Sequence, residues 1–490
     1  MTPVRDRGLP ALRRSFPILI YTVALLARLA PVVVSRDLGI GLDDMFQFDM
    51  LARSLAAGHG FRWYSPSDLG QIVTALRAYG VSIDEATLSS DPRGIPTSFR
   101  APLYPAFLSM VYTVSGLQDR FFATRLAQAF LTASLAPLTY GLALQMGARE
   151  KHARWVAWAP ALWPMLVLFP LGLATENLFQ PLLTAGVLAL CRATASSRWR
   201  WQAAAGALFG LAVLTRSVIV IFPILAAAWL WLRKERSSAA VLVGLLLVLT
   251  VPWSLRNSLL HGRPTFVETS LGYNLYLGYH PEGDGSFVFG PSLDLIPILD
   301  DAERDSRGRT LALEFIRENP WRLPGLMLSK LAHLWGLEDR IFVYFYSNGF
   351  LGRLSPLLVI ALFLILVLPL PFLAPLSLLG LASGKRDAPW TIAALLLASY
   401  MAVHVLVMAE ERFHLALVPL LAALAARGLS QGRELIARGR QGDAGARRLG
   451  FAAGTLMVLL LLSWGLELAA NSDKLAVLFG PEGASAHFDY

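Results

Sequence analysis

Three carboxylates follow a long apolar segment and lie within seven residues of one another. Asp43, Asp44 and Asp49 belong to the stretch GLDDMFQFDMLARSLAAGHGF, residues 41–61. A carboxylate placed at such a point can accept a proton from a hydroxyl group in a transition state. The same acids are also compatible with a solvated loop, which their spacing favours less but leaves open.

Further ionisable residues stand at the ends of other apolar segments. Glu176 lies in LATENLF, and a glutamate there can also have the purely structural role of stabilising the N-terminus of a helix. Arg216 interrupts the apolar run VLTRSVIV, which makes it a functional candidate, although an arginine can instead extend to the membrane surface. The remaining candidates are Arg256 and Asn257 in PWSLRN and Glu410, Glu411, Arg412 and His414 in EERFH. The EERFH segment is also compatible with a plain polar loop.

Carboxylates and arginines at a lipid–water boundary suit a substrate that is both a lipid and a phosphate. Arginine binds phosphate oxygens through paired hydrogen bonds, and a carboxylate can serve as the general base. The acidic pair could also hold a divalent cation, Mg²⁺ or Mn²⁺, but no spacing demands one. The histidines are scattered without metal-ligand spacing, and the single cysteine, Cys191, excludes an intrachain disulfide.

The composition indicates which elements position these groups. Hydrophobic residues make up 55% of the 490 residues and charged residues only 16%, against about 25% in soluble proteins. This predicts an all-α polytopic membrane protein, and the basic residues lie in short clusters between apolar runs, which excludes a soluble nucleic-acid-binding domain. Eleven spans are predicted, the first a retained anchor: 16–34, 122–146, 155–171, 178–194, 202–215, 217–232, 238–256, 354–380, 390–408, 413–428 and 450–469.

One further apolar stretch, 101–117, decides the topology. If it does not span, the predicted cytoplasmic segments hold 21 basic residues and the short outer segments hold three, Arg216, Arg412 and Lys474. A spanning 101–117 would invert this bias, so the positive-inside rule predicts an interfacial helix there. All the ionisable candidates then face the outer side of the membrane.

This topology divides the chain into four parts. Residues 1–257 form a transmembrane module that includes a first outer loop, 35–121. A second outer loop with interfacial helices occupies 258–353, the last transmembrane helices occupy 354–469, and 470–490 form an outer tail.

Several motifs resemble the GT-C superfamily of glycosyltransferases that use polyprenyl-phosphate sugars, among them protein O-mannosyltransferases and lipid A aminoarabinose transferases. The acidic pair follows the first helix, as in that family. The other matching segments, in the expected order, are FRAPLYPAFLSMVY (99–112), ATRLAQAFLTA (123–133), ATENLF (174–179), GLAVLTRSVIVIFP (210–223), PWSLRN (252–257), TSLGYNLYLGYHPEGDGSF (269–287) and FIRENPWRLPGLMLSKLAHLW (315–335).

The resemblance implies a GT-C fold and an inverting hexosyl- or pentosyltransferase that works at the outer face of a bacterial plasma membrane. The donor is expected to be a sugar on a polyprenyl phosphate, and the acceptor is a glycan, a lipid or a protein. Asp44 is favoured as the base, with Asp43 as the alternative and Glu176 as an orienting group. The donor phosphate is assigned to Arg100, Arg216, Arg256 and Lys330, and the acceptor or sugar to Tyr104, Asn257, Asn274, Glu411, Arg412 and His414.

Two other classes remain open. A lipid-linked saccharide flippase or transporter would place charges near the bilayer midplane and often shows internal repeats, which this sequence lacks. A polysaccharide polymerase or ligase would also use an outer loop and arginines, but it does not need an acidic pair after the first helix.

Overall fold

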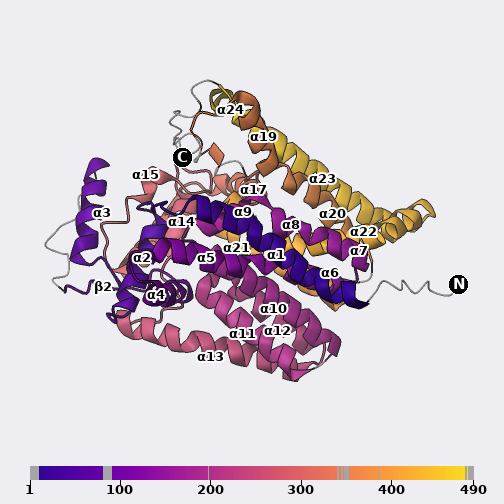
Figure 1. Cartoon of the computed structure of the whole chain (residues 1–490), viewed down its shortest axis with the longest axis horizontal. Coiled ribbons are helices and arrows are strands. Elements are labelled where there is room, and N and C mark those ends of the chain that lie inside the picture. Colours follow the sequence, from indigo (N-terminus) through magenta and orange to yellow (C-terminus); the bar gives the residue numbers. More distant parts are fainter. Residues whose placement is uncertain are drawn as a thin grey trace.

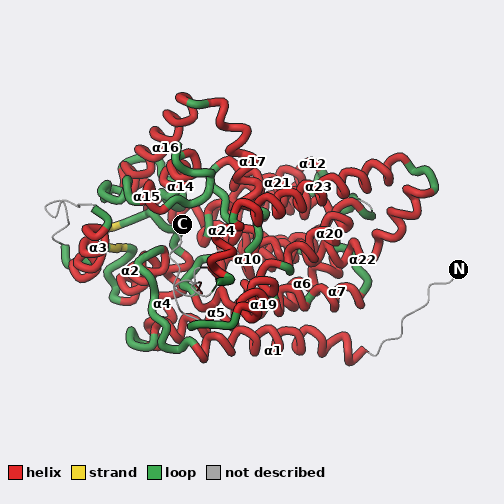
Figure 2. Tube along the Cα trace, turned by 90° about the horizontal axis from the view of Figure 1, so that it is seen from above, coloured by secondary structure: helices red, strands yellow, loops and turns green. Residues whose placement is uncertain are grey.

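The computed structural model describes residues 10–80, 91–196, 198–338, 342–343, 346, 352–384, 386–480 and 483. Their regular secondary structure is helical, apart from two short antiparallel strands, β1 (Arg62–Trp63) and β2 (Ile95–Pro96). Figures 1 and 2 show a bundle of long helices with smaller elements gathered at one end. The predictions for Arg5, Arg7 and Lys385, and for residues 481–482 and 484–490 of the tail, lie outside the described residues.

The first half of the chain alternates long helices with the elements of the first outer loop. Its helices are α1 (Pro10–Val34), α2 (Asp44–Ala56), α3 (Pro66–Ala78), α4 (Leu103–Ser115), α5 (Arg120–Ala133), α6 (Leu135–Gln145), α7 (Glu150–Val156), α8 (Trp158–Leu162), α9 (Pro164–Leu168), η2 (Phe169–Leu171), α10 (Glu176–Ser196), α11 (Trp199–Thr215), η3 (Ser217–Val220), α12 (Ile221–Leu232) and α13 (Arg236–His261).

The second half begins with the second outer loop and ends with further long helices. Its elements are α14 (Leu271–Tyr279), α15 (Phe289–Ser292), α16 (Asp301–Glu318), η4 (Pro320–Arg322), α17 (Leu323–Leu334), α19 (Pro356–Val367), α20 (Pro369–Ala382), α21 (Ala388–Leu406), η5 (Glu411–Leu417), α22 (Val418–Arg440), α23 (Ala444–Ala470) and α24 (Ser472–Leu478).

The helical architecture of a multi-pass membrane protein is confirmed. Within the described residues, eight helices are long and apolar enough to cross a membrane, or nine if the pair Glu150–Leu162 and Pro164–Leu171, bent by 52°, forms one span. The other two of the eleven predicted spans are α11, of 17 residues, and the helix Ser217–Leu232, which fall short of that length. They are short because Arg216 adopts an extended backbone conformation between them.

The apolar stretch 101–117 forms α4, a helix of only 13 residues. This length is below the roughly 17–25 residues that a span needs, in agreement with the prediction that it does not cross. Instead α4 packs against α2 and α5, and so it helps to build the end of the bundle where the acidic pair lies. Its position relative to a membrane stays a prediction.

Basic segments meet at the opposite end of the bundle. Arg427 donates hydrogen bonds to the Met146 carbonyl and the Asp387 carboxylate, and Ser430 accepts one from the backbone N–H of Arg149. These contacts join the segments after α6, before α21 and within α22. In Figure 1 the labels α6, α7 and α22 lie together, far from α2, α4 and α14.

Candidate active site

The acidic pair opens helix α2. Asp43 is the N-cap, and its Oδ1 accepts a hydrogen bond from the backbone N–H of Met45 at 2.8 Å, as N-cap aspartates do. Asp44 forms an ion pair with Arg100, which also donates to Gln47 Oε1 at 2.9 Å. The Arg100 guanidinium lies 5.3 Å from the ring centre of Phe48 and 5.0 Å from that of Phe99. Arg100 is therefore held from several sides beside the pair.

The third acid of the sequence stretch has a structural role. Asp49 is buried and accepts hydrogen bonds from Arg53 at 2.8 Å, Tyr112 at 2.9 Å and Arg120 at 2.8 Å. These partners come from α2, α4 and α5. Asp49 thus fastens the three helices together and leaves Asp43 and Asp44 as the acids that face the open space.

Two more ion pairs sit beside the acidic pair. Arg216 pairs with Glu176 at 2.5 Å, because the helix break after α11 brings Arg216 to the first turn of α10. Arg412 pairs with Glu410 at 2.8 Å. The Phe413 ring links the pairs, because the guanidinium of Arg216 lies 5.2 Å and that of Arg412 5.6 Å from its centre.

All these groups line one open cavity of about 2180 Å³. Part of its wall is aliphatic and comes from α9, η2, η3, α12 and α21: Met165, Leu168, Leu171, Val218, Val220, Ile221, Val403 and Leu406. Another part is aromatic and comes from both outer loops: Trp63, Tyr64, Tyr79, Phe99, Tyr273, Phe287 and Phe289. The charged row lies in the same cavity and consists of Asp43, Asp44, Arg100, Glu176, Arg216, Glu410, Glu411 and Arg412.

The cavity changes the acidity of groups outside the candidate spans. Desolvation raises the pKa of Asp43, and the nearby charge of Asp44 raises it further. The hydrogen bond from Met45 and the charge of Arg412 oppose this rise. Burial, with a further contribution from the charge of Asp44, raises the pKa of Tyr273 to about 12. Asp43 is therefore a better proton acceptor than an ordinary aspartate.

Five of the predicted site residues lie elsewhere. The sequence assigned Tyr104, Arg256, Asn257, Lys330 and His414 to substrate, but they do not line this cavity in the part of the chain that the structure describes. The buried Tyr104 hydroxyl donates to Gln128 Oε1 at 2.6 Å. Lys330 donates to the Val407 carbonyl at 2.9 Å and lies 3.6 Å from the centre of the Tyr279 ring.

The remaining three residues hold the surrounding backbone. Arg256 donates to the Thr97 carbonyl at 2.6 Å, and Asn257 donates to the Val267 carbonyl at 3.0 Å. His414 is hydrogen-bonded to the Leu334 carbonyl at 3.0 Å and to the Glu338 carboxylate at 2.8 Å. Their side chains therefore make packed structural contacts. Asn274, Glu411 and Arg412 do line the cavity, as do Arg100 and Arg216.

Several cavity residues were not selected from the sequence. Gln47 lies one turn from Asp43 on α2, and helical spacing could have suggested it. Glu268 accepts hydrogen bonds from the hydroxyl and backbone N–H of Ser217, and no sequence signal marked it. Tyr273 lies in a motif that resembles the GT-C family but was not assigned a role. The aromatic wall depends on how the two outer loops fold together.

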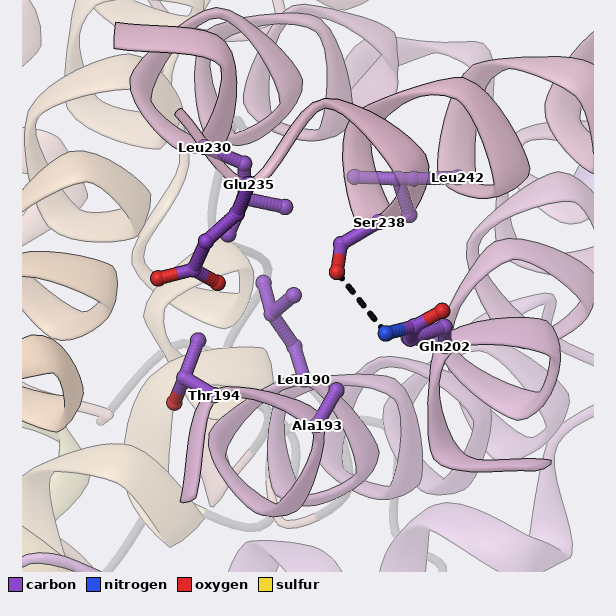
Figure 3. A pocket seen from close by; sticks show the side chains of 9 residues that line it. Leu190, Ala193, Thr194, Gln202, Leu230, Glu235, Ser238 and Leu242 are labelled. Carbon is purple, nitrogen blue, oxygen red and sulfur yellow. Dashed lines mark hydrogen bonds between the residues drawn. The ribbon is translucent and has the colours of Figure 1, made fainter. Parts of the chain in front are cut away.

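The described residues contain no group of three or more His, Cys, Asp or Glu side chains that could hold a metal ion. A cation at Asp43 and Asp44 would therefore lack a third such ligand there. A second, much smaller cavity of about 10 Å³ lies between α10, α11 and α13. Figure 3 shows its polar side, where Gln202 donates to Ser238 at 2.8 Å. It has room for roughly one water molecule and is not a substrate site.

Comparisons with known proteins give distant structural likenesses only. No known protein family matches the sequence, and no curated protein matches it. The crystal structure of ArnT from Cupriavidus metallidurans bound to undecaprenyl phosphate aligns with 14% identity and a TM-score of 0.45, over 98% of this chain and 74% of that one. The apo structure of ArnT from the same organism aligns with 15% identity and a TM-score of 0.35, over 86% and 78%. TM-scores below 0.5 do not establish a shared fold, so neither likeness supports an argument about the activity of this chain.

Proposed function

We propose that the protein is an inverting glycosyltransferase that moves a sugar from a polyprenyl phosphate to an acceptor hydroxyl. One observation carries this proposal: a single cavity joins an aliphatic wall, a row of carboxylates and arginines, and a polar aromatic wall. A lipid tail suits the first surface, a phosphate and a reacting hydroxyl suit the second, and a polar acceptor suits the third. The enzyme class, the donor and the GT-C fold are all part of the proposal.

The donor phosphate is assigned to Arg216 and Arg412, with Arg100 close by. Both Arg216 and Arg412 face the cavity and already pair with a carboxylate, at 2.5 Å and 2.8 Å. A phosphate also offers paired acceptor oxygens, with more negative charge, so it can share or take over these donors. The polyprenyl chain then extends along the aliphatic wall built by α9, η2, η3, α12 and α21.

The transfer step uses the acidic pair. The acceptor oxygen forms a bond to the anomeric carbon from the face opposite the phosphate, while the bond from that carbon to the phosphate oxygen breaks. Polyprenyl phosphate leaves with the bonding electrons, and the hydroxyl proton passes to Asp43 or Asp44. Most of the rate gain comes from positioning and from the arginines that stabilise the leaving phosphate.

The two carboxylates of the pair are not equivalent. The charge of Asp44 is compensated by Arg100, whereas Asp43 has a raised pKa. These contacts favour Asp43 as the proton acceptor over Asp44, which the sequence favoured. Glu176 fits a positioning role, because its carboxylate holds the Arg216 guanidinium.

The membrane is proposed to be a bacterial plasma membrane, with the cavity at its outer face. Support comes from the basic segments around Arg149, Arg427 and Arg438, which lie at the end of the bundle away from the cavity, where the positive-inside rule places the cytoplasm.

The direct test is a transfer assay with purified protein in lipid nanodiscs. A panel of undecaprenyl-phosphate sugars is supplied with a mixed cell-envelope extract as acceptor. We expect release of undecaprenyl phosphate and a product whose anomeric configuration is inverted. Movement of intact donor across a vesicle membrane without cleavage would indicate a flippase instead, and products with repeating sugar units would indicate a polymerase.

A further inference from the structure

The aromatic wall contains features that the transfer step itself does not require. Tyr64 follows strand β1 and has a backbone φ of 55°, in the left-handed region that non-glycine residues rarely adopt. Such a strained conformation persists only where the surrounding structure holds it, and such residues cluster at functional sites. The backbone is fixed from the other side by Gly94, with φ of 87°, where a Cβ atom would collide with the carbonyl of Trp63.

The strained turn presents an aromatic ring that is supported from behind. Trp63 is buried and stacks on Tyr64 with ring centres 4.5 Å apart and an angle of 25°. The guanidinium of Arg304, from α16, lies 5.7 Å from the centre of the Trp63 ring and 5.1 Å from that of Phe99. The first and second outer loops thus hold this part of the wall together, and Tyr64 lines the cavity in front of it.

The wall continues from the acidic pair outwards. Tyr273 packs edge-on against Phe99 at 5.8 Å, and its phenol experiences the charges of Asp44 and Arg100. Farther along, Tyr79 and Phe289 form a second aromatic contact at 5.1 Å, and they are 61% and 41% exposed. Both rings line the cavity, so a ligand bound there can cover them.

We propose that this wall is an acceptor subsite that binds a saccharide, so that the acceptor hydroxyl belongs to a glycan. The inference rests on the proposed function and specifies its acceptor. The flat faces of sugar rings carry C–H groups that pack on aromatic rings, while their hydroxyls need polar partners. Asn274, Ser306 and Arg309 line the same cavity and offer such partners.

Two other acceptor classes fit this wall less well. A lipid acceptor would need a second continuous aliphatic surface. The outer-loop side of the cavity instead interleaves a few aliphatic side chains, Ile72, Leu293 and Ile296, with the aromatic rings, and its elements lie outside the candidate spans. A peptide acceptor is commonly bound along the edge of a strand. The strands in the described residues are only two residues long, and β1 and β2 pair with each other.

The test removes the aromatic rings and leaves the charged row intact. Tyr64→Gly deletes one ring, and relief of the strained backbone offsets part of the stacking on Trp63 that is lost, so we expect this variant to fold. The second variant, Tyr79→Ala with Phe289→Ala, removes the outer contact and does not depend on the strained turn. Lys234→Gly is the matched control for strain relief, because Lys234 has φ of 64° far from the cavity. Trp321→Ala is the control for loss of an exposed aromatic residue, because Trp321 is 90% exposed and lies on η4.

The saccharide probes are oligomers of β-1,4-linked N-acetylglucosamine and of α-1,6-linked mannose, with binding measured by calorimetry in nanodiscs. We expect at least one series to bind saturably, and each cavity variant to weaken that binding by about tenfold, as the loss of an aromatic contact does. Both controls should bind as the natural protein does. The proposal is overturned if neither series binds saturably, or if the cavity variants bind the saccharide as tightly as the controls.

Binding of undecaprenyl phosphate is measured on the same samples. It separates the hypothesis of a saccharide acceptor subsite from the hypothesis of a polyprenyl-phosphate donor. If the lipid binds equally to all variants while saccharide binding falls only in the cavity variants, the subsite is supported. If the lipid binds and no saccharide does, the acceptor assignment fails and the donor assignment stands. If saccharide binds and the lipid does not, the proposed donor is wrong.

Discussion

The aliphatic and the aromatic walls of the cavity face the same charged row but arise from different parts of the chain. The aliphatic wall comes from α9, η2, η3, α12 and α21, which belong to the helical bundle or adjoin it. The aromatic wall comes from the turn after β1, from the end of α3 and from α14 and α15, all in the outer loops. In the proposed reaction, the bundle side of the cavity therefore suits a lipid tail and the loop side suits a water-soluble group.

The contrast between the two walls indicates where the specificity of the protein is encoded. An aliphatic wall accepts any flexible hydrocarbon chain, because dispersion and hydrophobic contacts have little directionality. Aromatic rings fixed by stacking and by a strained turn accept fewer shapes. We infer that the bundle determines the donor class and that the outer loops determine the acceptor.

The largest expected effect is on turnover, and it comes from substitutions in the charged row between the two walls. Replacing both acids, Asp43→Asn with Asp44→Asn, keeps size and hydrogen bonding but removes the proton acceptors. We expect turnover to fall by about 10²–10⁴-fold, the usual contribution of a general base. Donor binding should change little. Near-native turnover in the double variant would show that the pair has only structural roles, Asp43 as a helix cap and Asp44 as the partner of Arg100.

The single variants identify the base within the pair. A protonated Asp43 cannot accept the proton, so turnover should fall when the pH drops through the pKa of Asp43. Because this pKa is raised, we expect the fall at a higher pH than for an ordinary aspartate. In Asp43→Asn, the residual activity should no longer show this fall at low pH, the acidic limb of the pH profile. If Asp44→Asn shows the larger loss and Asp43→Asn retains the limb, Asp44 is the base.

The next effect compares two arginines with different partners. Arg216 pairs with a carboxylate in the cavity, whereas the buried Arg28 binds backbone carbonyls of Pro160 at 2.8 Å and Ala161 at 3.0 Å. Replacement by lysine keeps the charge but loses the planar fork. We expect Arg216→Lys to weaken undecaprenyl phosphate binding by about tenfold. Arg28→Lys should instead lower the unfolding temperature and leave that affinity unchanged. Equal donor affinity in both variants would make Arg216 structural.

A smaller effect probes the aliphatic wall itself. Ile221 lines the cavity and is 43% exposed, whereas Ile224, on the same helix and 51% exposed, does not line it. Ile221→Ser should weaken undecaprenyl phosphate binding about fourfold, which corresponds to the loss of one buried methylene contact at roughly 0.8 kcal/mol. Ile224→Ser should have no effect. Binding of saccharide should be the same in both, and a loss of saccharide binding in Ile221→Ser would contradict the division into two walls.

The sequence predicted the charged row better than the aromatic wall. Glu176, Arg216 and Arg412 were recognised because an ionisable residue at the end of an apolar run is costly, and this signal is local. The same signal cannot tell to which side of a helix end a side chain points, so it also selected Arg256, which binds the Thr97 carbonyl. The nearness of Tyr64 and Tyr273 depends on contacts between the two outer loops, and no local pattern encodes it.

The smallest expected effect concerns Lys330, which the sequence assigned to the donor phosphate. Burial lowers its pKa from 10.5 to about 7, and the charge of Arg322 contributes to this shift, while the Val407 carbonyl and the Tyr279 ring lie against the ammonium group. The unfolded chain keeps this proton up to about pH 10.5, whereas the folded chain releases it near pH 7. The unfolded state therefore binds more protons between these values, and Lys330 makes stability rise with pH there, by at most about 1.4 kcal/mol per pH unit.

Lys330→Met keeps most of the apolar stem and removes the titration. We expect the rise in unfolding temperature between pH 7 and pH 9 to become smaller in this variant than in the natural protein, whereas Lys151→Met, at an exposed position on α7, should leave the rise unchanged. Undecaprenyl phosphate binding at pH 7 should be equal in both variants, because Lys330 holds the segment before Arg412 from outside the cavity. If Lys330→Met alone loses donor affinity, Lys330 does bind the donor phosphate, as the sequence predicted. The charged row would then extend beyond the cavity wall to α17.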